Sequence, residues 1–138
     1  MKKMKMMILI TCIFSASLTA PPPQMIVIPA GEAIRPYEAI WNAVRFIEIG
    51  EMPNETINYE EQAYGPGQIR QIKLDWYYNR TGIRHSLRDC FSEEVSKSIF
   101  FYHMMQYPNI DRGIKAWNGS GPKTEIYLSK VKKVLLSL

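Results

Sequence analysis

One glutamate in the sequence stands where a charged side chain is unexpected. Glu48 follows Val44 by four residues and Trp41 by seven, so a helix over 36–50 would place the three on one face. Burial among apolar side chains disfavours the charged form of a carboxyl group and raises its pKa. Such a group can act as a general acid near neutral pH. The alternative is an ordinary solvated charge, which is what a glutamate near a helix end usually is.

Three short patterns follow one another along the chain. They read FIEIGEMP over 46–53, AYGPGQI over 63–69 and AWNGSG over 116–121. Tyr127 and the pair Lys130-Val131 come after the third pattern. Each pattern is weak by itself, so the information lies in their order and spacing.

In this order the patterns resemble those of the lytic transglycosylases, the lysozyme-like soluble transglycosylase family. That family has a Glu-Ser-Gly element at a helix end, then Gly-Leu-Met-Gln-Ile and Ala-Tyr-Asn-Ala-Gly elements, and a Tyr with Lys-Val in its last helix. The resemblance runs from residue 37 to about residue 133. It implies an all-α, lysozyme-like small domain that cleaves the N-acetylmuramic acid to N-acetylglucosamine β-1,4 bond of peptidoglycan.

Taken position by position, the resemblance assigns a site. Glu48 matches the catalytic glutamate, and Gly65 and Gln68 match the Gly and Gln of the second element. Trp117 and Asn118 match the Tyr-Asn pair. The remaining substrate-binding candidates are Asn58, near a family serine that orients the substrate, Tyr64, and Tyr127, which the helix stripe equally allows as a core residue.

The sequence also departs from the family pattern. Ile49 replaces the serine after the catalytic glutamate, which removes a hydroxyl group. Pro66-Gly67 replaces Leu-Met, which removes a side chain that would pack on the sugar. Trp117 replaces the tyrosine, and its indole donates a hydrogen bond but accepts none. These changes leave the acid in place and alter the contacts to substrate.

The chemistry that the resemblance implies needs one carboxyl group. The glutamate protonates the glycosidic oxygen and then takes the proton of the sugar's own 6-hydroxyl, which closes a 1,6-anhydro ring. A hydrolytic muramidase on the same fold is the first alternative, because hydrolases usually add a second carboxylate. The adjoining loop offers four: Glu51, Glu55, Glu60 and Glu61.

Two other classes of function stay open. The missing serine after Glu48 favours a catalytically weak module that binds glycan without turnover. A short exported interaction protein could also mimic the pattern by chance, in which case Glu48 and Gln68 would lie far apart.

Five helices and almost no strand are expected to position these residues. Pro36 suits a helix start, Gly50 a left-handed helix end, and Ser92 an N-cap. A small irregular hairpin fits the loop of residues 51–67, and Ser86 with Asp89 could cap a short turn. The expected helices span residues 36–50, 68–78 (with Ile69, Ile72 and Trp76 on one side), 92–107, 111–117 and 123–136.

The N-terminus predicts export. Residues 1–17 join a lysine-rich start to a short apolar run and small residues, which is typical of a secretory signal peptide. Residues 18–36 form an extended, proline-rich leader, and residues 37–138 form the transglycosylase-like domain. A lipid anchor at Cys12 is the second interpretation and an uncleaved N-terminal anchor the third. The expected location is periplasmic or extracellular.

Charge and composition limit the partners. Without the three lysines of residues 1–17 the net charge of +4 falls to +1, so nucleic acid is not an expected partner. Cys90 is then alone and is expected to be a small buried apolar residue, while His85 and His103 are expected to be structural or exposed. No metal or cofactor is implied, and the expected partner of a monomeric chain is a peptidoglycan strand.

Overall fold

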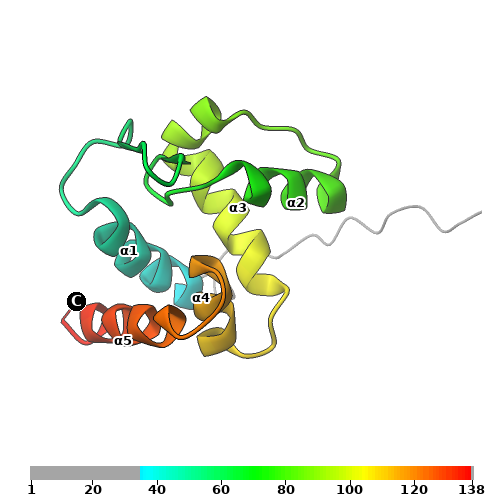
Figure 1. The fold of residues 1–138 in the computed structure, drawn as a ribbon. Coiled ribbons are helices and arrows are strands. Elements are labelled where there is room, and N and C mark those ends of the chain that lie inside the picture. The colour runs from blue at the N-terminus through cyan, green and yellow to red at the C-terminus, as the bar shows by residue number, and fades with distance from the viewer. Residues whose placement is uncertain (1–34, 138) are drawn as a thin grey trace, which may run out of the picture.

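The structure, a computed structural model, describes residues 35–137 and is mostly helical (Figure 1). Its helices are α1 (Arg35–Ile49), α2 (Gln71–Thr81), α3 (Glu93–Met105), α4 (Ile110–Asn118) and α5 (Lys123–Leu135), with a 3-10 helix η1 (Leu87–Phe91) before α3. Two-residue strands β1 (Ile57–Asn58) and β2 (Ala63–Tyr64) form an antiparallel hairpin. The expected small all-α domain of five helices is confirmed.

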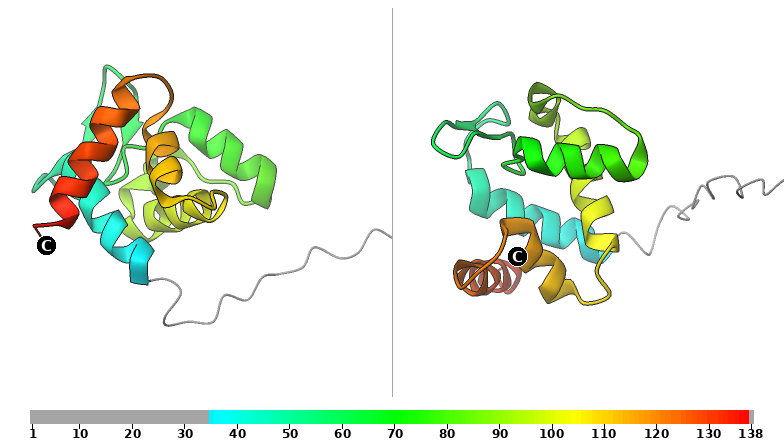
Figure 2. Two further views of the ribbon diagram at one scale, coloured as in Figure 1. Left: turned by 90° about the horizontal axis from the view of Figure 1, so that it is seen from below. Right: turned by 45° about the vertical axis from the view of Figure 1, so that its right-hand side comes forward.

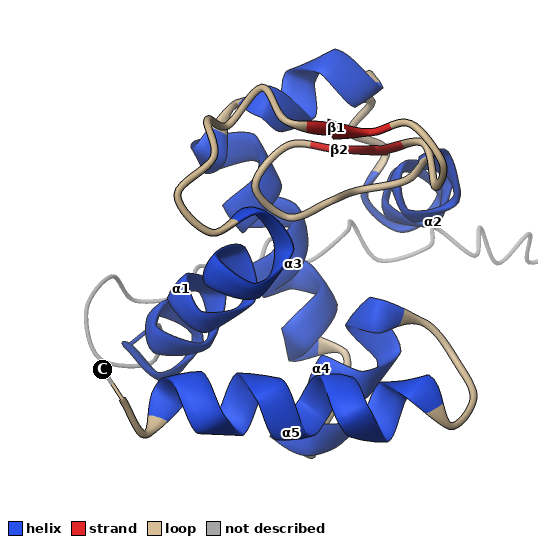
Figure 3. Ribbon diagram, turned by 60° about the vertical axis from the view of Figure 1, so that its left-hand side comes forward, coloured by secondary structure: helices blue, strands red, loops and turns tan. Residues whose placement is uncertain are grey.

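The elements form two groups with α3 between them. Helices α1, α4 and α5 lie together on one side, and the hairpin, α2 and η1 lie on the other (Figures 1 and 3). Helix α5 packs against α1 and crosses it at a wide angle, as two further views show (Figure 2). This arrangement brings the C-terminal ends of α1 and α4 to the side that faces the hairpin and α2.

The core is built around aromatic rings that pack against one another in tilted and edge-on pairs. Trp41 of α1 is fully buried, and its ring lies 5.4 Å from that of Phe100 on α3. Phe100 in turn meets Trp117 of α4 edge-on at 5.0 Å. Truncating one such buried aromatic typically costs about 3–5 kcal/mol. These rings therefore hold α1, α3 and α4 together.

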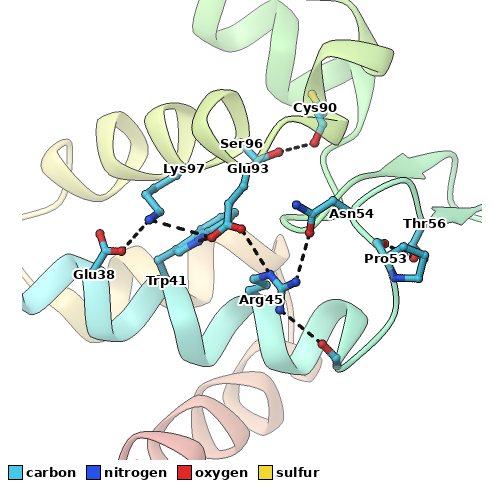
Figure 4. A network of polar contacts seen from close by, with 11 residues as sticks. Glu38, Trp41, Arg45, Pro53, Asn54, Thr56, Cys90, Glu93, Ser96 and Lys97 are labelled. Carbon is cyan, nitrogen blue, oxygen red and sulfur yellow. Dashed lines mark hydrogen bonds and ion pairs between the residues drawn. The ribbon is translucent and has the colours of Figure 1, made fainter.

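Polar contacts fix how α1 faces α3 (Figure 4). The Glu93 carboxylate accepts a hydrogen bond from the Trp41 indole at 3.3 Å and lies 3.9 Å from the Arg45 guanidinium. Lys97 pairs with Glu38 at 2.6 Å. Half-exposed pairs of this kind stabilise by only about 0–1 kcal/mol each. Their main effect is to set the rotation of α1 about its axis.

Several helix boundaries fall where the sequence predicts them. Helix α1 ends at Ile49, and Gly50 follows with φ +58° while its N–H donates to the Phe46 carbonyl at 2.9 Å. Ser92 caps α3 by accepting a hydrogen bond from the Val95 N–H. Ser86 and Asp89 form a reciprocal capping box at η1.

The start of α2 was predicted wrongly. The helix begins at Gln71 rather than Gln68, because Gln68 has φ +47° and Ile69 exchanges backbone hydrogen bonds with Tyr64. This shift changes which side chains are buried. Ile72, expected on the buried side, is 73% exposed.

The predicted leader also ends too late, since α1 already begins at Arg35. The rest of that leader, the predicted signal peptide and Cys12 lie outside the described residues. Within residues 35–137 no helix is both long and apolar enough to cross a membrane.

Candidate active site

Glu48 sits in the last turn of α1, on the side that faces a groove. Burial removes water from its carboxyl group and raises its pKa above the ordinary value of 4.5. The negative charge of Glu61 raises the pKa further, whereas Arg70 and Lys130 lower it by smaller amounts. The carboxyl group thus retains its proton to a higher pH than a solvated glutamate.

A tyrosine from the other end of the domain holds this carboxyl group. The Tyr127 hydroxyl on α5 donates a hydrogen bond to Glu48 Oε1 at 2.6 Å, across 79 residues of chain. Burial and the neighbouring Glu48 raise the pKa of Tyr127, so it remains a neutral donor. The bond lowers the pKa of Glu48, but by less than burial raises it. With Oε1 occupied, the carboxyl proton is free to reside on Oε2.

The groove beside Glu48 lies between the two groups of elements. Its volume is about 320 Å³, within the range of roughly 300–1,000 Å³ typical of small-molecule sites. The second sequence pattern and α2 form one wall, and the ends of α3 and α4 form the other. The side chains that line it are acidic, basic, amide-bearing and aromatic: Glu48, Glu61, Gln68, Arg70, Lys73, Trp76, His103, Tyr107, Trp117 and Asn118.

Glycines allow the second pattern to pack closely against the core. Gly65 has φ +76°, and a Cβ there would overlap the carbonyl oxygen of Cys90. A Cβ at Gly67 would lie 3.3 Å from the rings of both Trp41 and Trp117. A longer side chain at position 67 therefore has no room.

Gln68 holds the same turn in place. Its side-chain amide donates to the Gly65 carbonyl at 2.9 Å and to the Thr56 carbonyl at 3.4 Å. Its φ of +47° is uncommon for a residue with a side chain and costs about 1–3 kcal/mol. Strained residues of this kind cluster at functional sites. Gln68 both lines the groove and shapes its wall.

The structure brings most of the sequence-predicted site residues together. Glu48, Gln68, Trp117 and Asn118 line the groove, and Tyr127 contacts Glu48. Trp117 is mostly buried and packs on the core with the greater part of its ring. It therefore offers little exposed surface for sugar stacking.

Four predicted residues do not line the groove, and one of them, Tyr127, contacts Glu48 behind it instead. Asn58 is exposed, and its side-chain oxygen accepts hydrogen bonds from the backbone N–H groups of Glu60 and Glu61. Tyr64 stacks on Phe91 with the ring centres 5.9 Å apart. Gly65 is buried under η1 and shapes the turn rather than contacting the groove. Asn58, Tyr64 and Gly65 thus have structural roles in the hairpin and its turn, and a contact of any of them with substrate stays a prediction.

Two groove residues were missed by the sequence interpretation. Lys73 of α2 and His103 of α3 lie 30 positions apart, and Lys73 Nζ is 3.4 Å from His103 Nδ1. A signal for Lys73 was present, since it precedes Trp76 by three residues and Tyr77 by four within α2. It therefore belongs to the inward side of its helix. His103, expected to be structural or exposed, is buried.

His103 is held as a neutral ring. Burial and the positive charge of Lys73 lower its pKa to about 4. Its Nε2 lies 3.0 Å from the Gly113 carbonyl oxygen, which can only accept. The proton therefore resides on Nε2, and Nδ1 accepts a hydrogen bond from the Lys73 ammonium group.

Cys90 is buried, as expected, and burial raises the pKa of its thiol to about 12. A thiol with so high a pKa is a poor nucleophile at neutral pH.

No group of three or more His, Cys, Asp or Glu side chains suited to a metal ion occurs within residues 35–137. The chemistry available in the groove is proton transfer by Glu48 and binding by the surrounding polar and aromatic groups.

Comparisons of the chain with protein-family models, with curated proteins and with solved structures each returned no match.

Proposed function

We propose that this chain is a peptidoglycan-cleaving enzyme of the lytic transglycosylase kind, with Glu48 as its only catalytic acid and base. The observation that carries the proposal is the Glu48 carboxyl group, half-buried, hydrogen-bonded to Tyr127 and open to a groove. Protonating the poor leaving group of a glycoside requires an acid whose pKa is raised. Glu48 meets that requirement.

The reaction proceeds through one carboxyl group in two roles. Glu48 gives its proton to the glycosidic oxygen, the bond from C1 to that oxygen breaks, and positive charge develops at C1. The carboxylate then takes the proton of the 6-hydroxyl of the same sugar, whose oxygen closes on C1. The Tyr127 hydroxyl stabilises the carboxylate between the two transfers, because a hydrogen bond to a charged acceptor is the stronger kind.

The departures from the family pattern are compatible with this scheme. Ile49, in place of the serine, is 2% exposed and belongs to the packed interior. The hydroxyl group that contacts the acid comes from Tyr127 on the last helix. Asn118 lines the groove and would offer its amide to the sugar's hydroxyl and acetamido groups, whereas Gln68, whose amide hydrogens are already donated to backbone carbonyls, would offer only its side-chain oxygen.

A hydrolytic muramidase is the second candidate function. Of the four loop glutamates, Glu61 lines the groove, and its charge contributes to the raised pKa of Glu48. A second carboxylate in the groove could activate a water molecule or attack C1 directly. Glu51, Glu55 and Glu60 are exposed and do not line the groove.

The product separates the two candidates. Purified peptidoglycan is incubated with a protein of residues 18–138, and the masses of the released fragments are measured by mass spectrometry. A transglycosylase leaves 1,6-anhydro ends, which weigh one water less than the reducing ends left by a hydrolase. We expect anhydro ends from the wild-type chain and from Glu61→Gln. Reducing ends that disappear in Glu61→Gln would establish the hydrolase, and glycan binding without any release would establish a binding module.

The proposed substrate determines where the chain must act. Peptidoglycan lies outside the cytoplasmic membrane, so the proposal requires export, as the pattern of residues 1–17 predicts. The proposed location is periplasmic or extracellular, with a lipid anchor at Cys12 as the alternative to free release.

A further inference from the structure

The groove contains a cation that the proposed reaction does not use. Lys73 projects from α2 into the groove and is half-buried. None of the ion pairs within residues 35–137 includes it. Removing an ammonium group from water is costly unless an opposite charge compensates. A half-buried groove cation that forms no ion pair within these residues is therefore suited to bind an anionic group of a ligand.

Neighbouring groups hold the ammonium group in place. His103 Nδ1 accepts one of its three hydrogens at 3.4 Å. The group also lies 4.7 Å from the centre of the Trp117 ring and 5.9 Å from that of Trp76. Because His103 is fixed in turn by the Gly113 carbonyl, the lysine is positioned before any ligand arrives.

The ammonium group remains charged at neutral pH. Burial, and to a smaller extent Arg70, lower the pKa of Lys73 from 10.5 to about 8. Arg70 also lines the groove, but it is exposed and hydrated. Lys73 is therefore the groove cation that would gain most from pairing with an anion.

The surroundings of Lys73 favour a carboxylate carried on a sugar. The partly exposed Trp76 provides aromatic surface 5.9 Å from the ammonium group, and the amide-bearing Asn118 lines the same groove. Of the two sugars of the proposed substrate, N-acetylglucosamine is neutral and N-acetylmuramic acid carries a lactyl carboxyl group. Where a peptide is attached, that carboxyl group is an amide, and the peptide supplies carboxylates instead.

We propose that Lys73 is the specificity-determining cation of the groove and binds a carboxylate of the acidic sugar or of its attached peptide. The inference rests on the proposed function, since it assumes a glycan in this groove. His103 is a positioning residue that acts through Lys73. The alternative is that Lys73 only packs against the tryptophans and contributes nothing to the choice of ligand.

Calorimetric titration of an inactive protein tests the inference. In Glu48→Gln, which cannot cleave, affinities are measured for four oligosaccharides of equal length. One is neutral and built of N-acetylglucosamine, one contains N-acetylmuramic acid with free lactyl groups, one has those groups capped as methyl amides, and one bears peptides. We expect a carboxylate-bearing oligosaccharide to bind about tenfold or more tightly than the neutral and capped ones.

Variants assign that preference to Lys73. Adding Lys73→Met should bring the affinity for the carboxylate-bearing oligosaccharide down to that for the neutral one, so that their ratio is near one. Lys73→Arg should retain most of the preference because the charge remains. Lys133→Met is the matched control, since Lys133 is an exposed lysine of α5 that does not line the groove. It removes the same charge and should leave the ratio unchanged.

Each outcome is decisive. Tighter binding of the free lactyl form identifies the sugar's own carboxylate, and tighter binding of the peptide-bearing form alone identifies the peptide. Equal binding of all four oligosaccharides, or a preference that survives Lys73→Met, overturns the inference and leaves the proposed function standing. Failure of the protein to bind any of them overturns the proposed function and the inference with it.

Discussion

At the scale of single residues, burial and one hydrogen bond act in opposite directions on the pKa of Glu48. Burial raises its pKa, and the hydrogen bond from the Tyr127 hydroxyl lowers it by a smaller amount. The chain thus has a carboxyl group that keeps its proton to a higher pH than a solvated glutamate, and a hydroxyl donor that can stabilise the carboxylate once the proton has left. Removing the hydroxyl oxygen of Tyr127 would leave burial unopposed by this hydrogen bond.

Tyr127→Phe removes that oxygen and keeps the ring. The pKa of Glu48 should rise further, so the alkaline limb of the pH–activity profile should move to higher pH. The maximal rate should fall roughly tenfold or more, because the carboxylate loses a hydrogen bond to a charged acceptor. The measurement is the rate of peptidoglycan solubilisation from pH 4 to about pH 9, the range in which glutamates titrate in proteins.

Tyr37→Phe is the control for this prediction. Tyr37 lies at the other end of α1, about 16 Å from Glu48 at 1.5 Å per residue. Its variant should keep the wild-type profile. A Tyr127→Phe profile that also matches the wild type would show that the bond has no influence on the acid.

The sequence allowed some of these residues to be identified and not others. Glu48 stood out because a charge on an apolar stripe is visible from spacing alone. Its contact with Tyr127 spans 79 residues, and only the packing of α5 on α1 reveals it. His103 and Lys73 meet in the same way, across two helices.

At the scale of elements, the turn between the hairpin and α2 forms a wall of the groove. It is shaped by a glycine with no room for a side chain and by Gln68 with a positive φ. The sequence predicted the hairpin from its turn residues, but it placed the start of α2 three residues early. A positive φ at a glutamine has no signature in the sequence, since glutamine is otherwise a good helix former.

Gly65→Ala should disrupt this turn. The new methyl group would overlap the Cys90 carbonyl, and the backbone angle of +76° adds strain. We expect a loss of more than about 2 kcal/mol in the free energy of unfolding, measured by urea denaturation. Activity should fall as well, because Gln68 and the groove wall would shift.

Gly82→Ala tests the cost of the left-handed backbone conformation without the steric overlap that a methyl group meets at position 65. Gly82 ends α2 with a similar φ of +72°, but nothing lies within 4 Å of a Cβ there. This variant should lose only about 1–2 kcal/mol, the cost of the left-handed conformation alone, and should remain active. Equal losses in the two variants would contradict the close packing described for Gly65.

At the scale of the whole molecule, the groove is assembled from segments far apart in the chain. It takes residues from α1, from the turn before α2, and from α2, α3 and α4, while α5 supplies the hydroxyl behind the acid. Helix periodicity and caps predicted the five helices because those signals are local. They could not predict the way in which the helices meet, since that depends on packing between distant residues such as Trp41, Phe100 and Trp117.

A half-buried carboxyl group with a raised pKa should reduce the stability of the whole domain at neutral pH. The pKa of Glu48 is higher in the folded chain than its ordinary value of 4.5, so its contribution to stability is complete below that value and is lost as the pH rises through the folded pKa. Glu48→Gln cannot ionise, and its side-chain oxygen can still accept from Tyr127. The variant should therefore melt at a higher temperature than the wild type at pH 7.

The melting temperatures of the two proteins should converge as the pH falls below about 4.5, where glutamate is protonated even in the unfolded chain. Thermal unfolding followed by circular dichroism at pH 4 and at pH 7 measures this difference. A constant difference across that range, or a wild type that is more stable at pH 7, would contradict the raised pKa.

The central claim is that Glu48 transfers the proton that breaks the glycan strand. The most direct measurement compares the wild type, Glu48→Gln and Glu51→Gln for the release of soluble fragments from purified peptidoglycan at equal protein concentration. Glu51 is an exposed glutamate three residues further along, so it controls for the loss of one charge beside the groove. We predict that Glu51→Gln stays active and that Glu48→Gln loses at least about 10²–10⁴-fold in rate while remaining folded. Substantial release by a folded Glu48→Gln protein would contradict the claim.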